Sequence, residues 1–451
     1  MQELVDLLLY PRWLLPIIPA GVVLEQHALA VSQGQIVALL PAHEARERFV
    51  ARETETLETH LLMPGLVNLH CHAAMSLLRG MADDLPLSTW LSQHIWPAEA
   101  QHVSPRFVHD GTLLTCAEML RGGVTCFNDM YFFPEAAQEA VKEAGVRAVL
   151  GLTILEFPNA HAKNANECFS KGLAAHKTLH QQPRLSFCIA PHAPYSVSDD
   201  SFKRAAALAD ELHLPLHTHL HETRDEITQS LKEHRMRPLE RLHRLGLLGP
   251  KLIAVHAVHL EAQEISQLAA CGASVAHCPT SNLKHGSGIA PLAALLEAGV
   301  NVGLGTDGAA SNSRSSLFEE MRLSALLAKG STENASVVDA HAVLAMATLG
   351  GARALGLDKR IGSLEVGKAA DLCAVDFGCL HLSPCYNPAS HLLYALSGEE
   401  VSHVWVEGEA RLKNRAFVKL NAEALMALAT NWQREIWASR SLWCTHKNPN
   451  Q

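Results

Sequence analysis

The stretch LPLHTHLHE, residues 214–222, joins a short apolar run to three histidines and a glutamate at its carboxyl end. Seven other short apolar runs in the chain have the same form, and each is followed by a helix-like amphipathic segment. They are GLVNLH (65–70), GVTCFND (123–129), VRAVLGL (146–152), RLSFCIAPH (184–192), LIAVHAVH (252–259), ASVAHCP (273–279) and NVGLGTD (301–307). Because parallel neighbours need helical crossovers, eight such runs predict an α/β fold, a closed (β/α)8 barrel.

The segments between the runs carry helix signals. Residues 199–213 and 261–272 both open with acidic side chains, which favour a helix N-terminus, and the second ends at Gly272.

The two ends of the chain have a different pattern. Residues 21–63 alternate apolar stretches with turn-forming ones, and residues 361–377 return to short strands with glycine turns. We therefore predict a small β-sandwich domain built from residues 1–63 and 359–451, the latter with a terminal helix, around a barrel at 64–358. The apolar run within the first twenty residues is interrupted by Pro11 and Pro16, and we expect an edge strand there rather than a secretion signal.

Composition narrows the function classes. The 451 residues carry a net charge of -9 with scattered lysines and arginines, which disfavours nucleic-acid binding. No uncharged apolar stretch reaches the roughly 18 residues of a membrane span. The 11 cysteines, from Cys71 to Cys444, include no C-x-x-C pair, which is typical of reduced thiols in a cytoplasmic enzyme. We expect a soluble cytoplasmic protein that forms a homo-oligomer, a dimer or a tetramer.

Polar side chains gather at the ends of four predicted strands. His70 and His72 close the first run two residues apart, so both imidazoles point to one face. The fifth run ends in the residues from His217 to Glu222, the sixth in His256, and the eighth in Thr306 and Asp307. Because the carboxyl ends of barrel strands form the active-site face, these residues are expected to converge.

Three histidines and an aspartate predict a catalytic zinc site, since this set leaves a coordination position for water. Zinc lowers the pKa of that water from about 15.7 toward about 7. Fe²⁺ or Mn²⁺ could use the same ligands. Spacing alone does not choose among His217, His219 and His221, which share one face of an extended strand.

From about residue 60 to 376, the chain resembles the amidohydrolase superfamily and, more narrowly, its 5'-methylthioadenosine/S-adenosylhomocysteine deaminases. LVNLHCH alone marks only the superfamily; the full set of segments is far more specific. The segments are MPGLVNLHCHAAMSLLRGMADDLPLSTWL (63–91), WPAE (96–99), GVTCFNDMYF (123–132), APHAPYSVS (190–198), HTHLHET (217–223), AVHAVHL (254–260), HCPTSNLKHGSG (277–288), GLGTDGAASN (303–312) and GSLEVGKAADL (362–372).

The resemblance implies a role for each matching residue. The metal ligands are His70, His72, His219 and Asp307, with His217 and His221 as supporting residues. Glu222 is the proton shuttle between the attacking water and ring N1, and His256 orients the water and stabilises the developing negative oxygen. Asp307 also helps deliver a proton to the departing ammonia. Glu99 and His192 contact the nucleoside, and His259, His277 and His285 are expected to be structural.

Two departures from the family pattern refine this hypothesis. RLSFCIAPH has no terminal lysine of the kind that bridges two metals in binuclear members, so we predict one metal ion per subunit. Between Gly151 and Pro183 there are Lys163, Lys171 and Lys177 but no arginine, the residue that family members use for the carboxylate of S-adenosylhomocysteine. We therefore expect 5'-methylthioadenosine to be the better substrate, with S-adenosylhomocysteine and adenosine as further candidates.

Two other functions compete with this hypothesis. The same metal site could act on a free nucleobase or a triazine-like heteroaromatic compound, and in that case replacing Glu99 or His192 would matter little. A non-catalytic barrel scaffold is the other alternative, since fold does not dictate function. Scaffolds of this kind lose metal ligands, and this chain keeps all four.

Overall fold

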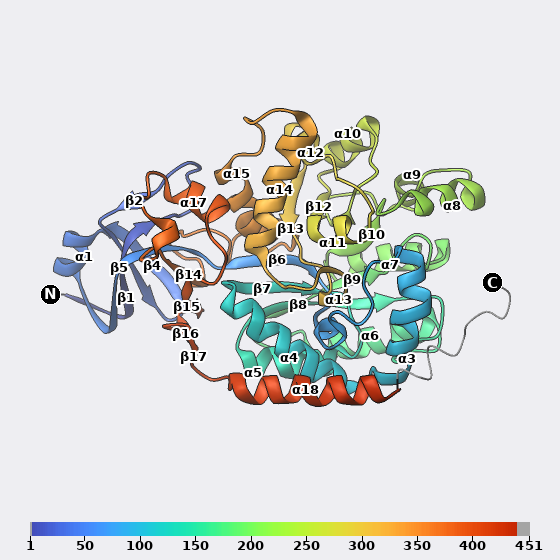
Figure 1. The fold of residues 1–451 in the computed structure, drawn as a ribbon, viewed down its shortest axis with the longest axis horizontal. Coiled ribbons are helices and arrows are strands. Elements are labelled where there is room, and N and C mark those ends of the chain that lie inside the picture. Colours follow the sequence, from blue (N-terminus) through green and yellow to red (C-terminus); the bar gives the residue numbers. More distant parts are fainter. Residues whose placement is uncertain (1, 440–451) are drawn as a thin grey trace.

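The computed structural model describes residues 2–439, and in that range eight parallel strands form a barrel (Figure 1). All eight runs expected to be strands are strands, in sequential order around the sheet, which confirms the predicted fold class. They are β6 (Leu66–Cys71), β7 (Val124–Asp129), β8 (Arg147–Ile154), β9 (Leu185–Pro191), β10 (Leu216–Leu220), β11 (Leu252–His256), β12 (Ser274–His277) and β13 (Asn301–Leu304).

The first and last barrel strands are joined by side chains and by backbone beyond the last strand. Asn68 on β6 donates to the Thr306 hydroxyl at 2.8 Å and accepts from the Thr306 backbone N–H at 3.0 Å. The Asp307 N–H donates to the His70 carbonyl at 2.9 Å. The barrel is therefore closed at the level where its candidate metal ligands lie.

Helices surround the barrel, and their ends follow local capping rules. Gly272 ends α10 in the left-handed conformation, as the sequence predicts, and Ser198 caps α7. The helices of the barrel region are α2 (Leu87–Trp90), α3 (Trp96–His102), α4 (Pro105–Arg121), α5 (Pro134–Ala144), α6 (Ala165–Leu179), α7 (Asp199–Glu211), α8 (Arg224–His234), α9 (Pro238–Arg244), α10 (Ala262–Cys271), α11 (Pro279–Lys284), α12 (Leu292–Glu297), α13 (Ala309–Asn312), α14 (Leu317–Thr332), α15 (Ala340–Ala345) and α16 (Gly351–Ala354).

Shorter helical turns complete this region. They are the 3₁₀ turn η1 (Ala73–Leu78) and the π turns η2 (Leu91–Ile95) and η3 (Met346–Gly350). Among residues 2–439, no helix combines the length and the apolar character needed to cross a membrane.

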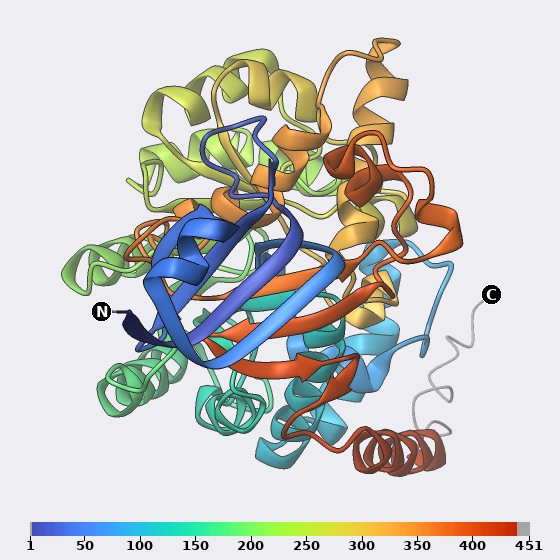
Figure 2. The same ribbon diagram turned by 90° about the vertical axis from the view of Figure 1, so that its left-hand side faces the viewer.

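The second sheet takes strands from both ends of the chain, as predicted (Figure 2). In the described residues its main path is β17-β16-β15-β14-β5-β1-β3-β4, with β2 on β1. The strands are β1 (Glu3–Leu14), β2 (Leu24–Glu25), β3 (His27–Ser32), β4 (Gln35–Pro41), β5 (Phe49–Pro64), β14 (Leu372–Asp376), β15 (Val401–Val406), β16 (Glu409–Lys413) and β17 (Ala416–Phe417). The remaining helices are α1 (Ala42–Arg48), η4 (Leu380–Leu382), α17 (Pro388–Tyr394) and α18 (Ala422–Ser439).

The N-terminal strand is not an edge strand, so this prediction was wrong. β1 pairs in parallel with β5 on one side and antiparallel with β3 on the other. Leu7, Leu8 and Leu9 are all buried, which means that both faces of the strand are covered. Pro11 is accommodated at a shift in register between β1 and β5.

A buried ion pair connects the two sheets. Arg147, the first residue of β8, donates through Nε to Asp371 Oδ2 at 3.0 Å, and through an η nitrogen to Glu407 at 3.1 Å. The side chains of Arg147 and Asp371 are each only 2% exposed. This contact lies at the amino end of β8, so the second sheet is anchored away from the carboxyl ends where the candidate site lies.

Candidate active site

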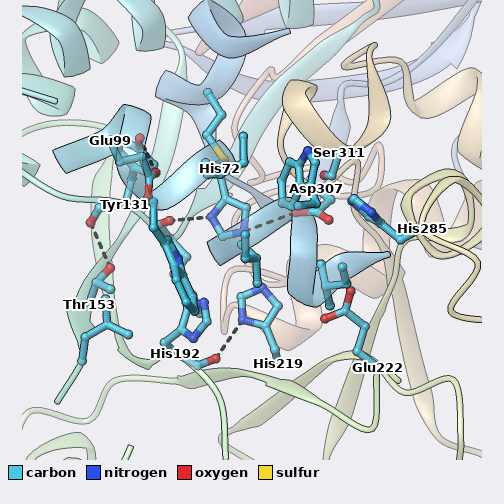
Figure 3. Close-up of a pocket in the computed structure, with 18 of the residues that line it drawn as sticks. His72, Glu99, Tyr131, Thr153, His192, His219, Glu222, His285, Asp307 and Ser311 are labelled. Atoms are coloured by element: carbon cyan, nitrogen blue, oxygen red, sulfur yellow. Dashed lines mark hydrogen bonds and ion pairs between the residues drawn. The ribbon is translucent and has the colours of Figure 1, made fainter. Parts of the chain in front are cut away.

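The four candidate metal ligands come together at the carboxyl ends of the barrel strands. His70 and His72 come from the end of β6, His219 from β10, and Asp307 from the segment after β13. One nitrogen each of His70, His72 and His219 lies within 4.8 Å of the others, and so do ligand atoms of His70, His256 and Asp307. Figure 3 shows His72, His219 and Asp307 around one centre.

Each of the three imidazoles is held through Nδ1, which leaves Nε2 facing the centre. His72 Nδ1 lies 2.7 Å from the Met130 carbonyl, and His219 Nδ1 lies 2.8 Å from the His192 carbonyl. His70 Nδ1 lies 3.0 Å from Nε2 of His217. Such outer contacts fix the ring orientation and the tautomer that a metal ligand needs.

The distances between ligand atoms fit one shared ion. Asp307 Oδ1 lies 3.3 Å from His70 Nε2 and 3.2 Å from His72 Nε2. A tetrahedral ion about 2.0 Å from each ligand atom places neighbouring ligand atoms about 3.3 Å apart. In addition, His70 Nε2 is buried without a hydrogen-bond partner among the described residues. The donor set and its spacing therefore suit zinc.

Burial and charge prepare this centre for a cation. Burial lowers the pKa of His70 to about 4 and that of His219 well below its usual value, so both rings are neutral, the form that binds metal. Burial also acts on His72, but its contact with Asp307 prevails and raises its pKa to about 9. Despite its burial, Asp307 has a strongly lowered pKa because His70 and His72 face it.

Glu222 and His256 lie beside this centre. The Glu222 side chain is buried, its Oε2 is 3.8 Å from His256 Nε2, and burial raises its pKa. His256 ends β11 in the left-handed region, with φ at 71°, and its Nδ1 lies 2.8 Å from Asn282 Oδ1. Thr223, not Glu222, caps α8. The Glu222 carboxylate is thus free to exchange protons inside the cavity.

Glu99 and His192 line the same cavity from another side (Figure 3). Glu99 lies on α3, where it accepts the Tyr131 hydroxyl proton at 2.7 Å, and burial raises its pKa to about 7. His192 follows β9, its Nδ1 lies 2.8 Å from the Ser196 hydroxyl, and burial lowers its pKa to about 3. Apolar walls come from Leu87, Trp90, Leu91, Ile95 and Trp96.

The other histidines separate into two groups. His221 turns away from the cavity: its Nε2 accepts the Leu239 N–H at 3.0 Å, which fixes α9. His259 contacts the Ser287 carbonyl and His277 is buried on β12, both consistent with structural roles. His285, in contrast, lines the cavity with its ring 4.7 Å from that of Trp90. His285 was expected to be structural, and its place in the cavity wall was not foreseen from the sequence.

Sequence reasoning missed the side chains that support the ligands. The Ser281 hydroxyl donates to Asp307 Oδ2 at 2.6 Å, and its neighbour Asn282 contacts His256. Both lie on α11, the helix that follows β12, and none of the candidate metal ligands comes from the end of β12. Their signal was the PTSN stretch (279–282) directly after a strand end.

A parallel barrel with imidazoles and a carboxylate converging at its carboxyl end defines a metal-dependent hydrolase. Residues 61–411 match the model of the amidohydrolase family, and the chain belongs to that family. A 5-methylthioadenosine/S-adenosylhomocysteine deaminase of Teredinibacter turnerae is 46% identical over 97% of this chain and 99% of its own. A 5'-deoxyadenosine deaminase of Methanothermobacter thermautotrophicus is 42% identical over 82% of this chain and 86% of its own.

A solved structure agrees with these relatives. An adenosine deaminase from Xanthomonas campestris with bound zinc superimposes with a TM-score of 0.96 at 47% identity, covering 97% of this chain and all of that one.

Proposed function

We propose that this protein is a zinc-dependent hydrolytic deaminase that converts 5'-methylthioadenosine to its inosine analogue and ammonia. The observation that carries the proposal is that ligand atoms of His72, His219 and Asp307 gather around His70 Nε2, beside a cavity that Glu222 lines. The deaminase relatives and the zinc-bound structure support it. Fe²⁺ or Mn²⁺ could replace zinc at such ligands.

The proposed ligands are His70, His72, His219 and Asp307. Zinc held there acts as a Lewis acid that makes water a nucleophile at neutral pH. The protein positions this chemistry by closing the barrel next to Asp307 and by fixing each ring through its Nδ1.

Three side chains move or direct protons in this proposal. Glu222 takes a proton from the attacking water and gives it to ring N1 while the new C–O bond forms at C6. A pKa raised by burial suits this exchange, because the carboxyl must both accept and donate near neutral pH. His256, held by Asn282, orients the water. Asp307 helps to pass the proton of the new C6 hydroxyl to the departing amino group, which leaves as ammonia while the C6 carbonyl forms.

Glu99 and His192 hold the ribose or the purine in this proposal, which favours a nucleoside over a free base. The preference for an apolar 5' substituent rests on the end of β8 and the segment that follows it. Thr153 and Leu155 line the cavity there, whereas none of Lys163, Lys171 and Lys177 is among the lining residues in the described chain. Lys171 is held 2.8 Å from Glu167 instead.

The domain boundaries and the oligomeric state are also proposals. We divide the chain at 63/64 and 358/359 between the small domain and the barrel, and β5 runs to Pro64 directly before β6. We also propose a homo-oligomer, a dimer or a tetramer, which sedimentation would test.

Ammonia release from the zinc-loaded protein tests the function. We expect turnover of 5'-methylthioadenosine and weaker turnover of S-adenosylhomocysteine and adenosine, with little from adenine, guanine or cytosine. Glu222→Gln should lower kcat by about 10²–10⁴-fold while zinc stays bound. Turnover of a free base with none of a nucleoside would overturn the proposal, and so would unchanged turnover by Glu222→Gln.

A further inference from the structure

A second buried carboxylate, Glu226, lies one helical turn beyond Glu222. It is 5% exposed, and both of its oxygens accept backbone protons. Oε1 accepts the His221 N–H at 2.9 Å, and Oε2 accepts the Glu222 N–H at 2.8 Å. Among residues 2–439, no lysine or arginine forms an ion pair with it. Its only hydrogen-bond donors there are thus the amides of the segment that carries Glu222.

Ordinary helix capping does not account for this arrangement. Thr223-x-x-Glu226 has the form of a capping box, and the Thr223 hydroxyl does accept the Glu226 N–H at 3.2 Å. In a capping box the glutamate returns to the N–H of the capping residue itself, here Thr223. Glu226 instead reaches past Thr223 to the two preceding amides. The carboxylate therefore secures the end of β10 more directly than it secures α8.

The backbone that it holds has a demanding conformation. His221 has a φ of 55°, which is uncommon for a residue with a side chain and persists only where its surroundings impose it. The Glu222 carboxylate makes no hydrogen bond among the described residues, and His256 Nε2 lies 3.8 Å from its Oε2. With so little to hold the side chain, the place of Glu222 depends on its backbone.

We propose that Glu226 is a positioning residue for Glu222. By accepting hydrogen bonds from the backbone N–H groups of His221 and Glu222, it fixes the backbone that directs the proton-shuttling carboxylate toward the reacting ring. This inference rests on the proposed deaminase function. It assigns no contact between Glu226 and the substrate, so it predicts a loss in kcat with substrate binding kept.

The test compares Glu226→Gln with a matched change on the same helix, Thr223→Val. Glutamine at position 226 keeps the size of the side chain but turns an NH₂ group toward one of the two backbone N–H groups. Valine at position 223 removes only the hydroxyl that caps α8. For Glu226→Gln we expect kcat for 5'-methylthioadenosine to fall by about 10- to 100-fold, because small misplacements of reacting groups are costly. KM and the zinc content should stay within about threefold of wild type. Thr223→Val should lower Tm and leave kcat within about twofold.

The outcomes separate the two proposals. A wild-type protein with no deaminase activity defeats the function itself. An active wild type with equal kcat in Glu226→Gln and Thr223→Val overturns the positioning role. Hydrogen exchange on the wild-type protein gives a test that needs no variant: the amides of His221 and Glu222 should be as protected as those within β10, and rapid exchange there would equally overturn the inference.

Discussion

Removing the Ser281 hydroxyl should weaken zinc binding without unfolding the protein. The hydroxyl donates to Asp307 Oδ2 at 2.6 Å, and Ser281 is 0% exposed, so no water can replace the lost donor without entering the core. A hydrogen bond to a charged group contributes about 1.5–3 kcal/mol. Since about 1.4 kcal/mol is tenfold in affinity, Ser281→Ala should weaken zinc binding by roughly 10- to 100-fold. Asp307 keeps the Gly308 N–H at 2.8 Å, so binding is not abolished.

The assay is a competition titration of apoprotein and zinc against a chelator of known affinity. Ser324→Ala is a matched control, because Ser324 is 1% exposed and donates to the Glu320 carbonyl at 2.7 Å on α14. The control should bind zinc like wild type. If Ser281→Ala also bound zinc within about twofold of wild type, the hydroxyl would have no part in orienting Asp307, and the reasoning would be refuted.

Three further outcomes are expected. Asp371→Asn should lower the free energy of unfolding by up to about 3–5 kcal/mol in a denaturant titration, because it removes the buried carboxylate charge beside Arg147 and leaves only the partly exposed Glu407 to face it. The exposed Asp210→Asn should cost at most about 1 kcal/mol. Burial raises the pKa of Glu99 to about 7, so its carboxylate forms as pH rises through 7; kcat/KM for the nucleoside should rise there and lose this dependence in Glu99→Gln. Finally, kcat/KM should be higher for 5'-methylthioadenosine than for S-adenosylhomocysteine, and an equal or higher value for the latter would contradict the proposed preference for an apolar 5' substituent.

The barrel could be predicted because each of its strands carries a local signal. A short apolar run ending in polar residues identifies a strand and its active-site end together, so His70, His72 and Asp307 could be placed before any partner strand was known. His219 was chosen over His217 and His221 only by the family resemblance. The Nδ1 contacts of His72 and His219 could not be predicted in this way, because the carbonyls of Met130 and His192 that they meet follow other strands.

Pairing in the second sheet was harder to predict. The sequence of β1 does not indicate that β5 is its parallel partner, because strand pairing depends on tertiary packing. The consecutive leucines at 7, 8 and 9 were nevertheless a usable signal, since a strand covered on both faces shows an unbroken apolar run. An edge strand with one solvated face would alternate.

The supporting residues were the least predictable part of the site. Ser281, Glu226 and His285 lie on helices or turns after strand ends, where the direction of a side chain depends on packing that sequence spacing does not reveal. His285 immediately follows α11, and its ring meets Trp90 from the segment before α3. This contact joins residues nearly two hundred positions apart, so no local pattern reports it.

Anomalous diffraction from crystals of the zinc-loaded protein, measured at the zinc absorption edge, tests the central claim most directly. We expect a single strong peak per chain, within bonding distance of the Nε2 atoms of His70, His72 and His219 and of the Asp307 carboxylate. A peak elsewhere, two peaks of full occupancy in one chain, or no peak at these four residues would contradict it.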